Sequence, residues 1–390
     1  MGIIFPKKYY FWGLEIAAMV KRDLDQTVSK RLKDNKAIII LGARQVGKTT
    51  FLANLLQGQD YLFIDGDDPL TIDLLTNANT ETLRRIIGSY KIVFFDEAQR
   101  IPNIGLLTKI IIDQIKNVKV YISGSSALDI SESINEPLTG RKWEYNLFPF
   151  SWNELVSHFD YLKMQQQLEQ RLVFGNYPDI VLNQGDEEEY LKQLVSSYLY
   201  KDVLKMAGIR KPVVLDKLLK MLAFQVGNEV SLNELARALS LDKKTVDSYI
   251  QLLEKTFIVF RIQSFGRNPR KEITTKKKVY FYDNGVRNAL ISNFNPLSLR
   301  TDVGALWENF MISERIKYLH YQRISANLYF WRNKQGQEID LIEERGGKIY
   351  AFEFKFSPSK SPKIPPSFET LYNSDFEVIH KGNFSSFLTI

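Results

Sequence analysis

The sequence contains no cysteine and only three histidines among its 390 residues. The absence of cysteine excludes a disulfide framework, a thiolate zinc site, an iron–sulfur cluster and a thiol nucleophile. His158, His320 and His380 lie too far apart in the sequence to suggest a metal site or a general base. Thiolate chemistry is therefore excluded, and no histidine stands out as a catalytic group.

Long apolar runs are also missing. No run reaches the roughly 18 to 20 residues that a helix needs to cross a bilayer. Lys7, Lys8 and Glu15 interrupt the apolar N-terminal segment, which argues against a signal peptide. A helical pattern begins directly after Met19, so we interpret residues 1–18 as an N-terminal extension. We expect a cytoplasmic protein without a membrane partner.

The chain has little excess of charge of one sign. Lysine and arginine number 52 against 45 aspartate and glutamate, a formal net charge of +7. This balance permits a polyanionic partner such as nucleic acid but does not require one. A hydrophobic content of 44% is typical of a globular protein, and the length allows two or three domains at roughly 150 residues each.

Short apolar runs alternate with helical patterns between residues 31 and 150. The runs are Ala37–Leu41, Tyr61–Ile64, Lys91–Phe95 and Val118–Ile122. Alternating strands and helices predict a parallel sheet covered by helices on both faces, in an α/β fold.

The strongest motif follows the first of these runs. Residues 42–50 read GARQVGKTT and fit the phosphate-loop pattern G-x-x-x-x-G-K-[ST] between a strand and a helix. Glycines let the backbone N–H groups curl around a phosphate, and the following helix adds its positive N-terminal dipole. Lys48 is predicted to hold the β- and γ-phosphates, and the Thr49 hydroxyl to bind Mg²⁺. The predicted nucleotide-binding residues are Gly42, Ala43, Arg44, Gln45, Val46, Gly47, Lys48, Thr49 and Thr50.

Polar groups end two further runs. Asp96 and Glu97 follow Lys91–Phe95, and the carboxyl end of a parallel strand is where ligands bind. Asp96 is predicted to hold Mg²⁺ through water, and Glu97 to orient and deprotonate the attacking water. Ser123 or Ser125, after the next run, would contact the γ-phosphate and that water; a Ser-Gly turn before a helix cap is the alternative.

A helix–turn–helix rhythm follows a helical region. Ser231 and Asp242 are placed to cap two helices, and Lys243 and Lys244 begin the second helix, where DNA contacts would occur. The stretch 261–278 carries seven lysines or arginines and one glutamate. These features fit a DNA-binding winged helix. Winged helices also serve as packing between domains, so both interpretations stay open.

Three segments together resemble a known family: GARQVGKTT, FFDEAQRIPN and ISGSSALDISESINEPLTGRKWEYNLFPFSWNEL. They are similar to prokaryotic ATPases of the AAA+ superfamily that carry a C-terminal domain of unknown function, and the resemblance covers residues 19–390. It implies ATP and Mg²⁺ as ligands. It also implies a P-loop sheet with a helical lid, a winged helix and a restriction-endonuclease-like α/β module. Arg141 is a candidate arginine finger, acting in its own chain or on a neighbouring one.

The C-terminal segment matches the Asp…Glu-x-Lys pattern of restriction-like nucleases. Asp340, Glu353 and Lys355 supply the pattern, and Glu308 is an additional acid on a helix. Glu308, Asp340 and Glu353 would bind Mg²⁺ through oxygen ligands, and Lys355 would steady the nucleophile or the developing charge. A fold kept for binding without cleavage is the alternative.

These observations predict an ATP-hydrolysing protein whose C-terminal modules bind or process DNA. The alternative is a nucleotide-dependent switch that binds a protein partner and carries an inactive nuclease-like module. Oligomers are compatible with either reading. The expected domains are an N-terminal extension and helix (1–30), a P-loop ATPase domain (31–150), a helical domain (151–225), a winged helix (226–290) and a nuclease-like α/β domain (291–390).

Overall fold

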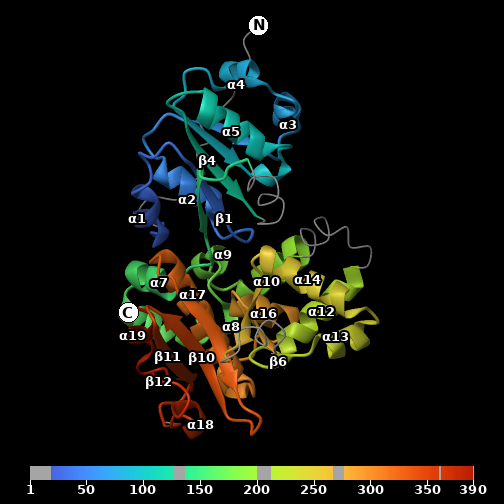
Figure 1. Cartoon of the computed structure of the whole chain (residues 1–390), viewed down its shortest axis with the longest axis vertical. Helices are drawn as coiled ribbons and strands as arrows, with labels where there is room; N and C mark the ends of the chain where they lie inside the picture. The colour runs from blue at the N-terminus through green and yellow to red at the C-terminus, as the bar shows by residue number, and fades with distance from the viewer. Residues whose placement is uncertain (1–18, 126–136, 200–211, 267–275, 360–361, 390) are drawn as a thin grey trace.

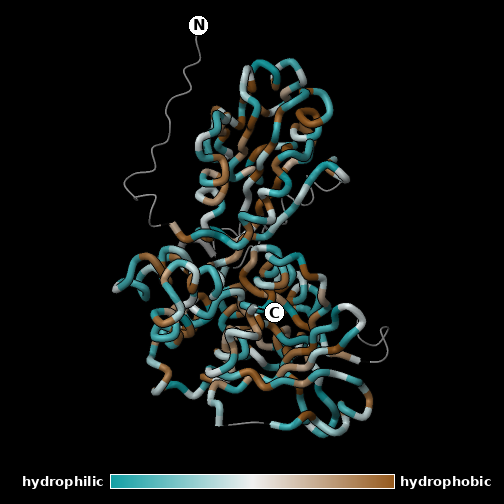
Figure 2. Tube along the Cα trace, turned by 90° about the vertical axis from the view of Figure 1, so that its left-hand side faces the viewer, coloured by the Kyte–Doolittle hydropathy of each residue, from teal (hydrophilic) through white to brown (hydrophobic). Residues whose placement is uncertain are grey.

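The computed structural model describes residues 19–125, 137–199, 212–266, 276–359 and 362–389. The predicted extension, residues 1–18, lies outside them. Two lobes stack along the long axis of the molecule (Figure 1), and hydrophobic segments run through the interior of both (Figure 2). Among the described residues, none of the helices has both the length and the apolar character needed to cross a bilayer.

The upper lobe is built on a five-stranded parallel sheet with strand order β2-β3-β4-β1-β5. Four of its strands match the predicted runs to within two residues, which confirms the predicted α/β fold. The edge strand β5 was missed because its sequence, KWEYN, is largely polar and lacks an apolar run. The strands are β1 (Ala37–Leu41), β2 (Leu62–Asp65), β3 (Ile92–Asp96), β4 (Lys119–Gly124) and β5 (Lys142–Asn146).

Helices connect these strands and pack on the sheet. Several begin at side-chain caps, such as Asp68 before α3 and Asn79 before α4, as short polar residues at helix starts do. The elements are α1 (Leu24–Ser29), α2 (Lys48–Leu55), α3 (Pro69–Leu75), α4 (Thr80–Ile87), the 3₁₀ turn η2 (Ala98–Arg100) and α5 (Ile104–Gln114).

The lower lobe begins with a set of helices. Ser151 and Glu154 form a capping box at the start of α7, which fixes where the chain enters this lobe. The elements are α7 (Trp152–Phe159), α8 (Tyr161–Phe174), α9 (Pro178–Leu182), α10 (Glu187–Gln193), the π turn η3 (Leu194–Leu199) and α12 (Pro212–Phe224).

Two short helices follow with the spacing that the sequence indicated. The Ser231 hydroxyl accepts a hydrogen bond from the Glu234 N–H at the start of α13 (Leu232–Leu239). The Asp242 carboxylate accepts a hydrogen bond from the Thr245 N–H at the start of α14 (Lys243–Lys255). Both predicted caps are confirmed. The elements after them are β7 (Val259–Ser264), β8 (Lys277–Phe281), α16 (Asn284–Leu290) and the 3₁₀ turn η4 (Leu297–Leu299), and β6 (Glu229–Val230) precedes them.

A seven-stranded mixed sheet runs through the lower lobe with order β12-β11-β10-β9-β7-β8-β6. Strand β7 pairs in parallel with β9, so the sheet continues across residue 290, where the sequence suggested a domain boundary. The division into five domains stays a prediction. The remaining elements are β9 (Asn327–Arg332), β10 (Glu338–Arg345), β11 (Lys348–Phe354), α18 (Pro366–Glu369), β12 (Ser374–Ile379) and α19 (Phe384–Phe387).

Helix α17 (Val303–Tyr321) forms the centre of the lower lobe. It contacts β8, β11, α8 and α16, and most of its residues are buried. A helix that is buried on all sides needs partners for its polar side chains. Arg315 finds one in Glu343 of β10, at 2.7 and 3.0 Å, and neither side chain is exposed. Other polar side chains of α17 contact the segment that joins the lobes.

Candidate functional site

The phosphate loop lies between β1 and α2, at the carboxyl end of the five-stranded sheet. Gly47 has φ +88°, which favours glycine, and a Cβ on Gly42 would lie 2.1 Å from the Leu147 carbonyl oxygen. The buried Lys48 ammonium donates to the carbonyl oxygens of Gly42 (3.0 Å) and Ala43 (2.8 Å), so its side chain folds back over the loop. The other predicted loop residues, Arg44, Gln45, Val46 and Thr50, belong to the same turn or to the first turn of α2.

Thr49 and Asp96 meet beside the loop. The Thr49 hydroxyl donates to the Asp96 carboxylate at 2.9 and 3.0 Å, and the Ser123 hydroxyl hydrogen-bonds to the same carboxylate. Burial raises the pKa of Asp96, against the hydrogen bonds from Ser123 and Thr49, which lower it. A hydroxyl and a carboxylate from adjoining elements are the oxygen ligands that Mg²⁺ prefers, so the donor set fits the predicted ion.

Glu97 follows β3 with a left-handed backbone, φ +45°. Gln99, in the 3₁₀ turn, donates to the Glu97 carboxylate and, at 3.0 Å, to the Ser125 hydroxyl. Ser125 is buried and lies 3.5 Å from Glu97. The structure thus brings Glu97 and Ser125 together through Gln99. No sequence motif assigned a role to this glutamine, whose only signal was its place two residues after Glu97.

Arg141 lies at the opposite end of the sheet. Its carbonyl accepts from the Ala37 N–H at the start of β1, and its side chain pairs with Asp113 at 2.8 Å. The five residues of β1 separate it from the phosphate loop by roughly 16 Å. In this structure the side chain of Arg141 therefore lies far from the phosphate loop of its own chain, and an arginine-finger role there stays a prediction. A role on a neighbouring chain stays a prediction.

The segment between the two lobes is held at alternate residues. We name residues 146–152 the connector strap. It runs along the C-terminal half of α17, where side chains about one helical turn apart meet its backbone groups. The Leu147 N–H also donates to the Leu41 carbonyl oxygen at 2.7 Å, next to the phosphate loop. The contacts are Asn146 N with His320 Nε2 (2.9 Å), Phe148 N with Tyr321 Oη (3.0 Å), Phe150 O with Lys317 Nζ (3.1 Å) and Trp152 N with Glu314 Oε2 (2.6 Å).

Arg22 joins this strap to the phosphate loop. Its guanidinium donates to the carbonyl oxygens of Val46 (2.9 Å) and Phe148 (2.6 Å) and to the Glu154 carboxylate (3.0 Å). It also lies 3.4 Å from the Tyr321 hydroxyl. A buried arginine with a carboxylate and several oxygen partners is a rigid connection. The sequence offered no motif that singled out Arg22.

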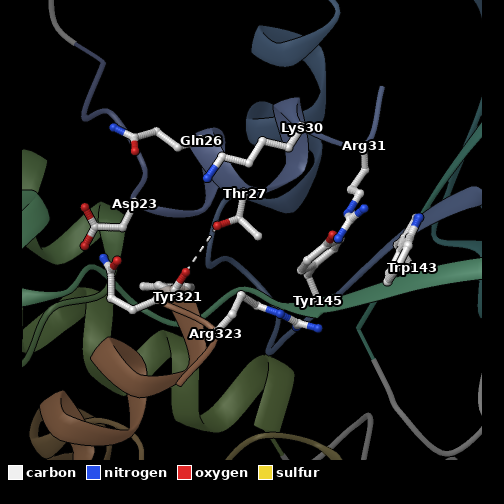
Figure 3. A pocket seen from close by; sticks show the side chains of 10 residues that line it. Asp23, Gln26, Thr27, Lys30, Arg31, Trp143, Tyr145, Tyr321 and Arg323 are labelled. Carbon is white, nitrogen blue, oxygen red and sulfur yellow. Dashed lines mark hydrogen bonds between the residues drawn. The ribbon is translucent and has the colours of Figure 1, made fainter. Parts of the chain in front are cut away.

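A cavity of about 300 Å³ lies at the same junction (Figure 3). Side chains from α1, from β5 and from the end of α17 line it, and Thr27 donates to the Tyr321 carbonyl oxygen at 3.2 Å. Arg31 and Arg323 lie beside the Tyr145 ring, whereas the Lys30 side chain extends toward Thr27 (Figure 3). Buried aromatic side chains, among them Tyr145, Phe148 and Tyr321, pack beside this cavity, so packing and hydrogen bonds together hold this part of the junction.

The predicted nuclease-like residues are brought together in the lower lobe. Asp340 on β10 accepts from the Phe354 N–H at 2.8 Å, and Lys355 pairs with Glu353 at 2.6 Å. Glu308, in the first half of α17, accepts from the Tyr280 hydroxyl at 2.6 Å. Burial, and then the charge of Asp340, raise the pKa of Glu308 to about 7. Their metal-binding role stays a prediction.

Lys278 of β8 also enters this cluster. Its ammonium lies 3.0 Å from Glu308 and pairs with Glu338, and its side chain is 1% exposed. Burial alone would lower the pKa of Lys278, but the charges of Glu308, Asp340 and Glu338 raise it overall. Among the described residues, no three His, Cys, Asp or Glu side chains form a group arranged to hold a metal ion. Lys278 is the last residue of the basic stretch 261–278, for which the sequence predicted DNA contact.

The basic stretch is mostly paired where the structure describes it. Arg261 contacts Asp247 and Glu254 of α14, and Lys276 pairs with Glu229 at 2.6 Å. The arginines and lysine at 267, 270 and 271 lie outside the described residues. Lys243 and Lys244 are exposed at the start of α14. Of the predicted DNA-contacting lysines in the described part of the chain, these two and Lys276, whose side chain is 69% exposed beside Glu229, face solvent.

Three family models match successive parts of the chain. Residues 34–156 match an AAA domain, residues 165–297 a domain of unknown function (DUF8612), and residues 303–385 a domain of unknown function (DUF4143). The chain therefore contains a P-loop domain of the AAA class. More particularly, it combines an AAA domain with a C-terminal DUF4143 domain, as the sequence resemblance predicted.

Proteins that match most of this chain do so at low identity. An uncharacterized protein of Mycobacterium tuberculosis is 24% identical over 370 residues, covering 93% of this chain and 80% of the relative. An uncharacterized protein of Methanocaldococcus jannaschii is 24% identical over 353 residues, covering 85% and 77%. The solved structure of a Walker-type ATPase of Pyrococcus abyssi is 17% identical, covers 70% of this chain and 96% of that one, and has a TM-score of 0.49.

Proposed function

We propose that this protein binds ATP with Mg²⁺, hydrolyses it, and uses its nucleotide state to control DNA binding by the lower lobe. The contact between Thr49 and Asp96 carries the proposal, because it joins the phosphate loop to the neighbouring strand at one oxygen-rich point. Bound Mg²⁺ would supply positive charge against the phosphates.

The residues around this point have separate roles. The Lys48 ammonium would exchange its carbonyl partners for phosphate oxygens, and the loop N–H groups would bind the remaining oxygens. Glu97 would accept a proton from the attacking water, while Gln99 holds its carboxylate in place. Ser125, on the far side of Gln99, would orient that water or the γ-phosphate.

The connector strap and Arg22 support the transmission step. Arg22 is hydrogen-bonded to Val46 in the loop, and the strap is hydrogen-bonded to Leu41 just before it. A movement of the loop would therefore displace Arg22 and the strap. The strap is in turn bound along α17, and α17 carries Glu308 in its first half. Nucleotide binding therefore has a continuous, buried route to the centre of the lower lobe.

DNA is the proposed output because α13 and α14 have helix–turn–helix spacing and α14 presents Lys243 and Lys244 to solvent. One observation favours the second candidate, a switch that binds a protein partner. Arg261, Lys276 and Lys278 are paired with acids, so they add little positive potential to this face.

The test of hydrolysis uses Glu97→Gln. This variant should keep ATP affinity and lose at least about a hundredfold in turnover, as expected when a general base is removed. Gln99→Leu should cause a smaller loss in turnover, since it leaves the base but removes the group that holds it. Unchanged turnover in Glu97→Gln, measured by phosphate release, would show that the base is assigned wrongly.

The test of output measures turnover, DNA affinity and DNA integrity with single-stranded, duplex and branched DNA. Lys243→Glu/Lys244→Glu should weaken DNA binding and its salt dependence, whereas Lys217→Glu, an exposed lysine on α12, should not. If turnover ignores every DNA and the double variant binds like the parent protein, the protein-partner candidate replaces the DNA candidate.

A further inference from the structure

The acidic cluster of the lower lobe contains a lysine that belongs to a different part of the chain. Lys278 lies on β8, whereas Glu308 lies on α17 and Glu338 on β10. Lys278 and Tyr280 are two residues apart on one strand, so both side chains point to the same face. Both contact the Glu308 carboxylate, at 3.0 and 2.6 Å.

The cluster consists of four acids and two lysines. Glu338 adds a fourth acid to Glu308, Asp340 and Glu353, and it pairs with Lys278. Lys355 pairs only with Glu353 among the described residues, and its side chain is 32% exposed. Lys278 is therefore the deeply buried cation, and the Phe330 ring lies 5.3 Å from its ammonium. An ammonium at this depth persists only with carboxylate partners.

Two of the predicted metal ligands, Glu308 and Asp340, thus already accept hydrogen bonds from other groups of the protein. Glu308 accepts hydrogen bonds from Lys278 and Tyr280 through the same oxygen, and Asp340 accepts one from the Phe354 N–H. A divalent cation entering the cluster would lie beside the ammonium of Lys278 and be repelled by it. The cluster therefore has room beside Glu308 for the Lys278 ammonium or for a divalent metal ion, but not for both.

We propose that Lys278 is the built-in cation of this cluster, and that a divalent metal ion binds Glu308, Asp340 and Glu353 only when Lys278 moves out. The inference rests on the proposed function in one respect, since it takes these acids as the metal ligands of the nuclease-like module. It adds that the module is closed in this conformation. The lysine lies on β8, which pairs with β7, and β7 contacts the predicted DNA-binding helix α14, so a shift of these strands would open the site.

The experiment measures Mn²⁺ binding to the full chain without nucleotide, by isothermal titration and by electron paramagnetic resonance. Lys278→Met should bind one Mn²⁺ more than the parent protein, with an affinity at least about tenfold higher at that site. Mn²⁺ should also raise the melting temperature of Lys278→Met, because the ion replaces the lost charge, but not that of the parent protein. Lys277→Met, a half-buried neighbour on the same strand, is the matched control and should behave like the parent.

Lys278→Met leaves several buried carboxylates without their partner and could fold poorly. Lys278→Met/Glu338→Gln removes one of those charges, keeps the three predicted ligands and should still gain the Mn²⁺ site. Lys278→Met/Asp340→Asn should lose it. A parent protein that binds Mn²⁺ as tightly as Lys278→Met, or a folded Lys278→Met/Glu338→Gln without the gain, would overturn the proposal. ATP turnover and DNA affinity of the same samples test the proposed function separately, since Mn²⁺ binding needs neither.

Discussion

The two lysines at the candidate sites are both buried, yet they have different surroundings. Lys48 in the upper lobe is hydrogen-bonded to the carbonyl oxygens of its own loop. Lys278 in the lower lobe is paired with carboxylates from two other elements. Carbonyl oxygens are neutral and yield to a phosphate at little cost, whereas a buried ion pair resists separation. The first arrangement is suited to exchange for a ligand, and the second to keeping the acids of the cluster occupied until Lys278 is displaced.

Exchanging each lysine for methionine gives the sharpest test of this comparison. Lys48→Met should abolish ATP binding and turnover, with little change in the melting temperature of the nucleotide-free protein. Lys278→Met should keep ATP binding and lower the melting temperature. Binding of a fluorescent ATP analogue and thermal unfolding of both variants decide the matter. Normal ATP binding by Lys48→Met would mean that the phosphate loop is assigned wrongly.

The connector strap allows a second prediction, because His320 accepts a hydrogen bond from its backbone. Burial, and then the charge of Arg323, lower the pKa of His320 to about 4. The unfolded chain takes up this proton near pH 6.5, so the folded state loses stability as the pH falls from about 6.5 toward 4. The loss from this one group is at most about 3 kcal/mol.

Urea unfolding at pH 7.5 and pH 5 measures this dependence. His320→Gln can still accept the hydrogen bond from Asn146 but does not titrate, so its stability should fall less over the same interval. His158→Gln, which changes a histidine outside the strap, should keep the dependence of the parent protein. Equal dependence in all three proteins would show that His320 does not gain a proton on unfolding.

The smallest expected effect concerns Arg141. Its distance from the phosphate loop of its own chain predicts that Arg141→Ala changes turnover by less than about twofold in dilute solution, where chains act alone. A concentration series separates this from a role on a neighbouring chain, which would appear as a loss of turnover only at high protein concentration. A large loss at every concentration would contradict the geometry described above.

Local signals in the sequence predicted much of the upper lobe. The apolar runs, the glycines of the phosphate loop and the acids at strand ends each depend on neighbours within a few residues. The helix caps Ser231 and Asp242 were predictable for the same reason. The polar edge strand β5 was not, since an edge strand needs no apolar run to be paired on one side.

The contacts that join distant segments could not be predicted. Arg22 is hydrogen-bonded to Val46 of the phosphate loop, 24 residues away in the sequence, and to Phe148 of the strap, 126 residues away. Lys278 pairs with acids on two other elements. No motif in the neighbouring sequence identifies either residue, because its partners depend on how α17 and the seven-stranded sheet pack. Arg261 shows the same limit: it belongs to a basic stretch in sequence, but the fold pairs it with two acids of α14.

The parallel pairing of β7 with β9 has a consequence for how this protein can be divided. A fragment that begins at residue 291 would keep β9 but lose the strand beside it, exposing an open sheet edge with unpaired N–H and C=O groups. Such an edge pairs readily with other chains and leads to aggregation. Segments 226–290 and 291–390 therefore have to be produced as one polypeptide. A chimera with a relative should likewise exchange both segments together.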